Sequence, residues 1–472
     1  MEQRSKFTIR TSDRRVFRRC LRKWDFQSSL RQNLTHKGTE QNINFWFGSA
    51  IHFALEDFHG WNRFKDPRRA FYAYYEAFPE SELPLGAEAH YELGMAMLSY
   101  YMTWLERHNE GPKFETAWFY DDMSPAKPHA EGAHPAVEQQ FYIPLGVYAV
   151  VSCVDDTILY TLWEDEENAP HEALLWKKEY ESYVDKELSY NEVSTLLGLD
   201  MWGNMMVKIV PIYYHGTIDK IMVDCYGRYW LCDYKTAKGA DTNKLATDDQ
   251  VSAYMWAVSK VFPFPVRGFV YLQLTKEAVQ EPRRLKNGEL SVDKKQKTTY
   301  SLLKQEIIKD YGSVQEAPNK LIQFLNHLAA AEAPEGDRFI RWDFVERTPE
   351  QVKSTEKHIY GELRHMLDSD MYCYPSPTRD CIWDCPFREI CIAMDKEDND
   401  YCAELLRDYE PRPRNEDGNI DPWRENIKWP ESDGDLLPLE QILNFEQCMT
   451  IELESRADNT NGFQFMYEEE DC

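Results

Sequence analysis

Two apolar segments that each lead into an acidic residue constrain the fold of this chain more than any other feature. The run Ile212 to Ile218 is followed by Asp219, and the run Tyr229 to Cys232 is followed by Asp233 and, two residues on, Lys235. The short stretch between the two runs, residues 220–228, predicts a hairpin of two buried strands. We expect each carboxylate to close its strand, which would gather charged groups at one end of a buried sheet.

The spacing of these charged residues predicts a metal site. Residues i and i+2 of a strand point to the same face, so Asp233 and Lys235 should emerge together while the Tyr234 side chain points away. Asp219 would approach from the paired strand. Two carboxylates and the backbone carbonyl of Tyr234 are oxygen ligands of the kind that Mg²⁺ or Mn²⁺ prefers. Lys235 would hold a metal-bound water or stabilise charge developing at a phosphorus, which favours a metal-dependent phosphodiesterase over a solvated surface ion pair.

Four separated motifs extend this interpretation. In chain order they are GxxxH, GxxD, DxK and QxxxY, at Gly48–His52, Gly216–Asp219, Asp233–Lys235 and Gln250–Tyr254. The set resembles the PD-(D/E)XK nuclease superfamily, and within it the RecB-type nucleases that include the AddB subunit and the CRISPR-adaptation nucleases. The resemblance implies an α/β, restriction-endonuclease-like fold, a mixed central sheet flanked by helices.

The resemblance also implies roles for the motif residues. His52 would be a further metal ligand, although a histidine in an apolar helical segment is also an ordinary core residue. Gln250 and Tyr254 would orient the active site and contact the DNA strand. Glu138 opens a strand of alternating polar and apolar residues, at a place where the family often has an acidic residue. An ordinary strand carboxylate that faces solvent is an equally good interpretation of Glu138.

A second group of residues is rich in sulfur. Cys381, Cys385 and Cys391 lie within eleven residues, and closely spaced cysteines in a chain without a secretory signal favour a metal or cluster over disulfides. Resemblance to the iron–sulfur subset of RecB-type nucleases implies Cys20 as the fourth ligand of a [4Fe–4S] cluster, with zinc as the alternative. The spacing departs from the usual CxxC of that subset, and Cys373 is a possible substitute ligand.

Such a cluster would act first as a staple. It would join the start of the chain to a segment some 360 residues later, and closing so long a loop constrains the unfolded chain. We therefore expect residues 1–391 to form the nuclease module, with a helical N-terminal region, an insertion at 146–205 and cluster-binding ends at Cys20 and 381–391. Residues 392–472 would form an acidic tail, either disordered or a docking segment that mimics nucleic-acid charge.

Charge distribution bears on nucleic-acid binding. The net charge of −27 argues against a phosphate-rich ligand, but residues 392–472 hold 23 acidic and 7 basic side chains, more than half of the excess. Residues 1–40 hold 11 basic and 4 acidic side chains. These, with the lysine- and arginine-rich stretch at 283–297, could line a DNA channel or be ordinary solvated segments.

Helical patterns are predicted at 8–31, with Thr11 or Ser12 as the cap, and at 45–60, 67–108, 301–330 and 349–368. With no long apolar run and no signal sequence, we expect a cytoplasmic protein with no membrane contact.

The resemblance favours a single-stranded DNA exonuclease of recombination, repair or phage DNA replication, working with a helicase or recombination protein. The first alternative is a catalytically weak, nuclease-fold DNA-binding subunit of a helicase or recombination complex. A second is a zinc-stapled structural protein.

Overall fold

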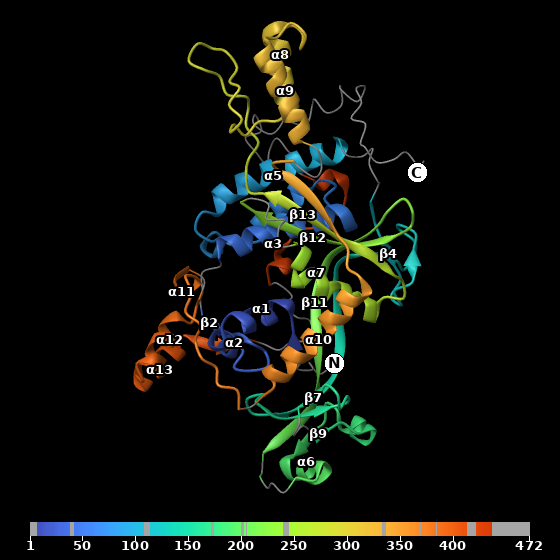
Figure 1. The fold of residues 1–472 in the computed structure, drawn as a ribbon, viewed down its shortest axis with the longest axis vertical. Coiled ribbons are helices and arrows are strands. Elements are labelled where there is room, and N and C mark those ends of the chain that lie inside the picture. Colours follow the sequence, from blue (N-terminus) through green and yellow to red (C-terminus); the bar gives the residue numbers. More distant parts are fainter. Residues whose placement is uncertain are drawn as a thin grey trace.

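The computed structural model describes residues 7–37, 42–107, 114–170, 174–199, 203, 205–238, 245–332, 337–368, 370–383, 385–412 and 422–436. One mixed sheet forms its centre (Figure 1). Within these residues, the strands of this sheet are β1 (Phe7–Ile9), β3 (Glu115–Thr116), β7 (Val137–Ser152), β8 (Ile158–Trp163), β9 (Leu174–Leu175), β10 (Glu187–Ser189), β11 (Met206–Val223), β12 (Tyr229–Ala237), β13 (Val266–Thr275) and β14 (Ile340–Val345).

The strand order is β14-β13-β12-β11-β7-β8-β9, with β1, β3 and β10 paired to β11. β12 and β13 run parallel, whereas β11 is antiparallel to both β7 and β12. Two smaller sheets pair β2 (Leu34–His36) with β15 (Tyr409–Pro411), and β4 (Trp118–Phe119) with β5 (Pro125–Ala126) and β6 (His134–Pro135).

Helices pack on both faces of the central sheet, and others project beyond it (Figure 1). They are α1 (Thr11–Arg19), α2 (Leu21–Gln27), α3 (Ile43–Glu56), α4 (Pro67–Glu76), α5 (Ala87–Arg107), α6 (Tyr190–Leu197), α7 (Asp249–Val261), α8 (Tyr300–Tyr311), α9 (Asn319–Ala331), α10 (Pro349–Met366), α11 (Asp380–Trp383), α12 (Arg388–Asp395) and α13 (Asn399–Leu406). Among the described helices, none is both long enough and apolar enough to cross a lipid bilayer.

Alternation along the strands divides the core into two layers. Leu231 belongs to the layer formed with α7 and α10, and its neighbours Trp230 and Cys232 belong to the layer formed with α3, α4 and α5. The fold is therefore the expected mixed sheet between helices, consistent with a restriction-endonuclease-like architecture. The α8–α9 pair projects from one end of the molecule, and α6 lies at the other (Figure 1).

The predicted N-terminal helix at 8–31 is wrong in three details. Its helical residues extend only from Thr11 to Gln27, and Thr8 and Ile9 belong to strand β1. The helix divides at Cys20, which is extended (φ −158°, ψ 109°), because the chain turns from α1, packed near α7, into α2, where the Arg22 N–H donates to the Tyr374 carbonyl. The N-cap position is Arg10 rather than Thr11 or Ser12. The Thr11 hydroxyl instead bonds the Tyr214 hydroxyl at 2.7 Å, so it serves tertiary packing and not capping.

The other predicted helices are present with shifted ends. The motif helix is α3, continued by one π-helical turn at Asp57–Trp61, and the stretch 67–108 contains two helices, α4 and α5. Helices α8, α9 and α10 occupy the predicted 301–330 and 349–368 regions.

The segment expected as an insertion continues the central sheet. β7 runs on to Ser152 and pairs with Val207 at the start of β11, and β8 to β10 and α6 lie between them. Its side chains form a small core of their own around Val150, Leu162 and Val193. The division at 146–205 stays a prediction, since the strands pass through its lower boundary.

Part of the acidic tail is folded onto the module. Helix α12 crosses residue 391, and β15 pairs with β2 near the N-terminus. Further on, Trp423 is buried 4.3 Å from the Tyr74 ring centroid. These contacts fit a docking segment for the described residues, and the boundary at 391 stays a prediction. Residues 413–421 and 437–472 lie outside the described part of the chain.

Candidate active site

Asp219 lies where β11 changes partners. β11 pairs with β7 up to Ile218 and with β12 from Lys220 onward, and the register Lys220 to Cys232 brings Asp219 beside Asp233. The Tyr234 N–H donates to Asp219 Oδ2 at 2.6 Å. The prediction that the carboxylates close their strands is wrong, because both strands continue past them and are held by pairing to further strands. The two carboxylates are 8% and 2% exposed.

Asp233 connects three of the predicted site residues. Lys235 Nζ lies 2.7 Å from Asp233 Oδ2, and Gln250 Nε2 donates to Asp233 Oδ1 at 2.9 Å. Gln250 is in the first turn of α7, where the Asp248 side chain accepts hydrogen bonds from the backbone N–H groups of Gln250 and Val251. The cap fixes the start of α7, and this fixes the position of the Gln250 amide.

The two aromatic site residues lie on opposite sides of the sheet. Tyr254, one turn after Gln250, packs edge-on against Phe141 with ring centroids 5.7 Å apart. The Tyr234 ring points away from the carboxylates, as strand alternation predicted, and stacks on His59 at 6.2 Å. The Tyr234 backbone still borders the site through its N–H bond to Asp219. The prediction that the Tyr234 carbonyl binds a metal stays a prediction.

His52 reaches the carboxylates from α3, on the other face of the sheet. Its Nδ1 lies 3.5 Å from Asp219 Oδ2. Ligand atoms of His52, Glu138 and Asp219 all lie within 4.8 Å of one another. Glu138 therefore turns toward the site rather than to solvent. It does so with φ of 47°, a left-handed conformation that costs a non-glycine residue about 1–3 kcal/mol.

A fourth carboxylate and one arginine complete the surroundings. Glu56 follows His52 by four residues on α3, and Arg424 donates to both of its oxygens at 3.3 and 2.8 Å. Neither Glu56 nor Arg424 was among the predicted site residues. The four-residue spacing from His52 was the available signal for Glu56, because such residues share one helix face. Nothing in the sequence pairs it with Arg424, 368 residues later.

Carboxylates outnumber cationic groups at the site. Burial, reinforced by Asp219 and only partly offset by Lys235, raises the pKa of Asp233 to about 6. Burial, with Asp219 and Glu56, holds the pKa of Glu138 well above its usual range. Burial alone would lower the pKa of Lys235, but Asp233 and Asp219 raise it overall. Buried carboxylates in excess over cations, with an imidazole beside them, fit a divalent cation such as Mg²⁺ or Mn²⁺.

The structure brings the four predicted cysteine ligands to one region. Cys20 lies between α1 and α2, while Cys381, Cys385 and Cys391 come from α11, the following loop and α12, and all four are half-buried. Burial raises the pKa of Cys385, and Cys381 and Cys20 add to this effect. Burial also raises the pKa of Cys391, again with a contribution from Cys20. The sulfurs are thus near enough to interact electrostatically.

Two further observations concern these sulfurs. Within the described residues, only His52, Glu138 and Asp219 place three possible ligand atoms within 4.8 Å of one another, so no three of the cysteine sulfurs lie within that distance. Cys373 contacts Arg31, with 3.9 Å between Sγ and Nη2. Burial raises its pKa, with Asp25 adding to the effect.

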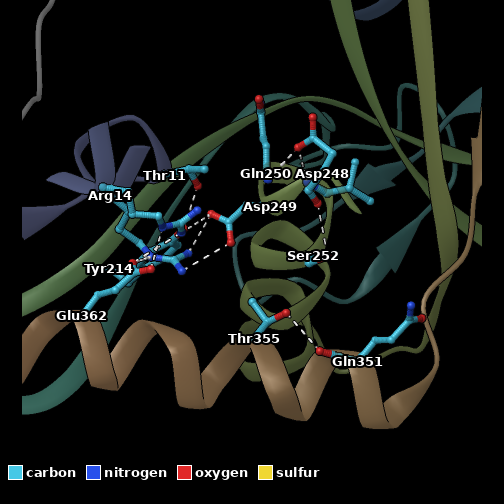
Figure 2. Close-up of polar contacts among 12 residues, drawn as sticks. Thr11, Arg14, Tyr214, Asp248, Asp249, Gln250, Ser252, Gln351, Thr355 and Glu362 are labelled. Atoms are coloured by element: carbon cyan, nitrogen blue, oxygen red, sulfur yellow. Dashed lines mark hydrogen bonds and ion pairs between the residues drawn. The ribbon is translucent and has the colours of Figure 1, made fainter. Parts of the chain in front are cut away.

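Many of the basic residues expected along a DNA channel are tied to carboxylates. Figure 2 shows Arg14 reaching from α1 toward Asp249 on α7 and Glu362 on α10. Arg18 pairs with the same two carboxylates at 2.9 and 2.6 Å. These ion pairs fasten α1 to the helix that carries Gln250, so they are structural contacts.

The loop after β13 shows the same pattern. Arg283 pairs with Asp293 of the same loop, and Arg284 pairs with Glu306 and Asp310 of α8. Much of the cationic character of this loop is therefore neutralised locally.

Comparison with known proteins agrees with this geometry. The family model of the PD-(D/E)XK nuclease superfamily matches residues 139–392, which is more than half of the chain. The match includes Asp219, Asp233, Lys235 and the cysteines of 381–391, and it leaves out His52 and Cys20, which precede it. No curated protein matches the chain. Members of this family are nucleases that use divalent metals. The chain belongs to the PD-(D/E)XK nuclease superfamily.

Proposed function

We propose that this protein is a Mg²⁺- or Mn²⁺-dependent deoxyribonuclease of the RecB type that digests single-stranded DNA from an end. The observation that carries the proposal is the meeting of Asp219, Asp233 and Lys235 with His52 and Glu138 in one buried, electronegative site. The single-strand and exonuclease assignments rest on the motif resemblance. They imply a role in recombination, repair or phage DNA replication, with a helicase or recombination protein as partner in the cytoplasm.

The residues divide the chemical work as follows. A divalent cation held by Asp219, Asp233, His52 and the Tyr234 carbonyl would supply Lewis acidity toward the phosphate and activate water. Lys235 stays protonated, because its carboxylate neighbours raise its pKa. Its ammonium group therefore serves to stabilise negative charge developing on the phosphate, rather than to accept a proton.

Gln250 and Tyr254 act in support. The Gln250 amide holds Asp233 Oδ1 at 2.9 Å and so fixes the orientation of that carboxylate. Preorganisation of this kind matters because a ligand that must reorient during the reaction adds to the barrier. Tyr254, packed on Phe141, forms a rigid wall next to Gln250 that a DNA strand would contact.

We propose further that Cys20, Cys381, Cys385 and Cys391 hold a [4Fe–4S] cluster. The support is their convergence from both ends of the module and the resemblance to the iron–sulfur subset of RecB-type nucleases. The Phe26 and Phe387 rings, 4.9 Å apart, pack the same two segments together. The cluster would staple α2 to α12 and thereby hold the N-terminal region on the nuclease module.

One observation favours a second function, a nuclease-fold DNA-binding subunit with weak catalysis in a helicase or recombination complex. Arg14, Arg18 and Arg284 are tied to carboxylates, and the whole chain is strongly acidic. Phosphate contacts supply most of the non-specific affinity for DNA. A partner with a basic channel would then have to provide part of that affinity.

Digestion of labelled oligonucleotides distinguishes these functions. Single strands labelled at either end, the matching duplex and a circular single strand are incubated with Mn²⁺, with EDTA as the control. The proposal expects stepwise shortening of the linear single strand from one end and an intact circle. Cleavage of the circle would contradict the exonuclease assignment. No metal-dependent cleavage of any of these DNAs would favour the subunit function.

A further inference from the structure

A cavity of about 250 Å³ lies beside the candidate active site. Gln250 and Tyr254 form one side of it, and Gly216 and Thr217 of β11 form another. Thr217 precedes Asp219 by two residues along β11. Gln250 borders the cavity and also donates to Asp233. The cavity therefore lies next to the carboxylate site.

The part of the cavity lining that comes from the start of α1 is basic. It consists of Arg10 and Arg15, both exposed, with Thr11 and Ser12 between them. Arg14, next to Arg15 in the chain, is instead buried against Asp249 and Glu362. Helix α1 thus turns one arginine inward to fasten the fold and leaves another on the cavity.

The start of α1 adds to this basic character. Arg10 is the N-cap of the helix, and Thr11 and Ser12 of its first turn line the cavity. Unsatisfied N–H groups and the helix dipole favour an anion at this end. The Asp13 carboxylate accepts a hydrogen bond from the Arg10 N–H at 2.9 Å, and Asp13 does not line the cavity.

The size of the cavity limits its ligand. Sites for drug-sized ligands occupy roughly 300–1,000 Å³, so this cavity is small for an unstacked nucleoside. A phosphate group is compact, anionic and suited to the guanidinium geometry of Arg10 and Arg15. The position beside Asp219 and Asp233 would then set the strand relative to the reacting phosphate.

We propose that the cavity lined by Arg10 and Arg15 is a phosphate subsite, which holds a phosphate of the DNA strand next to the one that is cut. This inference rests on the proposed nuclease function and adds a specific binding site to it. The bound group is either an internal phosphodiester or the phosphoryl group at a strand end. The experiment below separates these two sources.

The test measures DNA binding without cleavage. The full-length protein in EDTA is titrated with a fluorescent oligodeoxythymidylate, with and without a 5′-phosphate, at several salt concentrations. Arg15→Gln removes one cation of the subsite, and Ser12→Trp fills the cavity without changing the net charge. Arg19→Gln is the matched control, because it removes the same charge from the same helix outside the cavity. Melting curves establish that each variant is folded.

The subsite predicts that Arg15→Gln weakens binding about tenfold and lowers the salt slope of the affinity by about one ion. Ser12→Trp should weaken binding similarly, and Arg19→Gln should change it less than about twofold. If loss of the 5′-phosphate weakens wild type to the level of Arg15→Gln, the subsite holds a strand end. If both oligonucleotides bind wild type equally, it holds an internal phosphodiester.

Two results would overturn the subsite: Arg15→Gln and Ser12→Trp binding like Arg19→Gln, or no binding by wild type. Failure of the nuclease proposal is a separate observation. A protein that binds through Arg15 but cleaves no DNA with Mn²⁺ keeps the subsite and loses the nuclease. A protein that cleaves DNA while Arg15→Gln binds like Arg19→Gln keeps the nuclease and loses the subsite.

Discussion

Replacing Asp233 by asparagine should stabilise the metal-free protein. The Asp233 carboxyl is 2% exposed, and its pKa is raised to about 6 by burial and by Asp219. An acid whose pKa is higher in the folded than in the unfolded state destabilises the fold once it ionises. The rise of about two units from the ordinary value corresponds to at most about 3 kcal/mol above pH 6. Asparagine has nearly the same shape and no charge to bury, although it gives up the ion pair with Lys235.

The stability gained by Asp233→Asn should depend on pH. The destabilisation is absent below the unfolded pKa near 4 and complete above the folded pKa near 6, so the advantage of Asp233→Asn should be full at about pH 7.5 and about half as large at pH 5. Melting temperatures of both proteins in EDTA measure it, and a gain of a few degrees is expected. Adding Mn²⁺ should stabilise wild type more than the variant. A variant that melts below wild type in EDTA at both pH values would refute the electrostatic reasoning.

Three further substitutions test other parts of the structure. In a melting assay, Gly216→Ala should lower the free energy of unfolding by about 1–3 kcal/mol, because the added Cβ would lie 2.5 Å from the Phe141 ring. The control is Gly361→Ala on helix α10, where nothing lies within 4 Å of the added Cβ, and this change should be neutral or stabilising. Trp423→Ala should release the docked C-terminal segment, because a buried indole contributes about 3–5 kcal/mol, and limited proteolysis would then cut near it; an unchanged digestion pattern would contradict the docking. Cys385→Ser should remove the brown colour and the absorbance near roughly 400 nm that a [4Fe–4S] cluster gives anaerobically purified wild type; colourless wild type holding about one zinc would reject the cluster.

Strand periodicity accounts for most of what the sequence could predict of the site. Because alternate residues share a face, the pattern placed Asp233 beside Lys235 and turned Tyr234 into the core, as the structure shows. Gln250 was identified through the resemblance of Gln250–Tyr254 to the QxxxY motif, and the Asp248 cap at the start of α7 fixes its position. These are local rules, in which a few consecutive residues determine the outcome.

The remaining features depend on contacts between distant segments. The orientation of Glu138 requires a left-handed backbone that its sequence neighbours do not indicate. Arg424 meets Glu56 only because the C-terminal segment docks on α3. The break at Cys20 is likewise set by packing, since the surrounding residues are compatible with one continuous helix. The sequence left open whether the basic residues of 1–40 line a DNA channel or are solvated, and Arg14 is instead buried by carboxylates from two other helices.

The most direct test of the central claim is the initial rate of cleavage of end-labelled single-stranded DNA with Mn²⁺ by wild type, Asp233→Asn and Lys235→Gln. The account predicts metal-dependent cleavage by wild type and a loss of at least about 10²-fold in each variant, because each removes a charged group at the reacting phosphate. Since Asp233→Asn should be the more stable protein, its loss of activity would not reflect unfolding. Cleavage by both variants at the wild-type rate would contradict the assignment of this site.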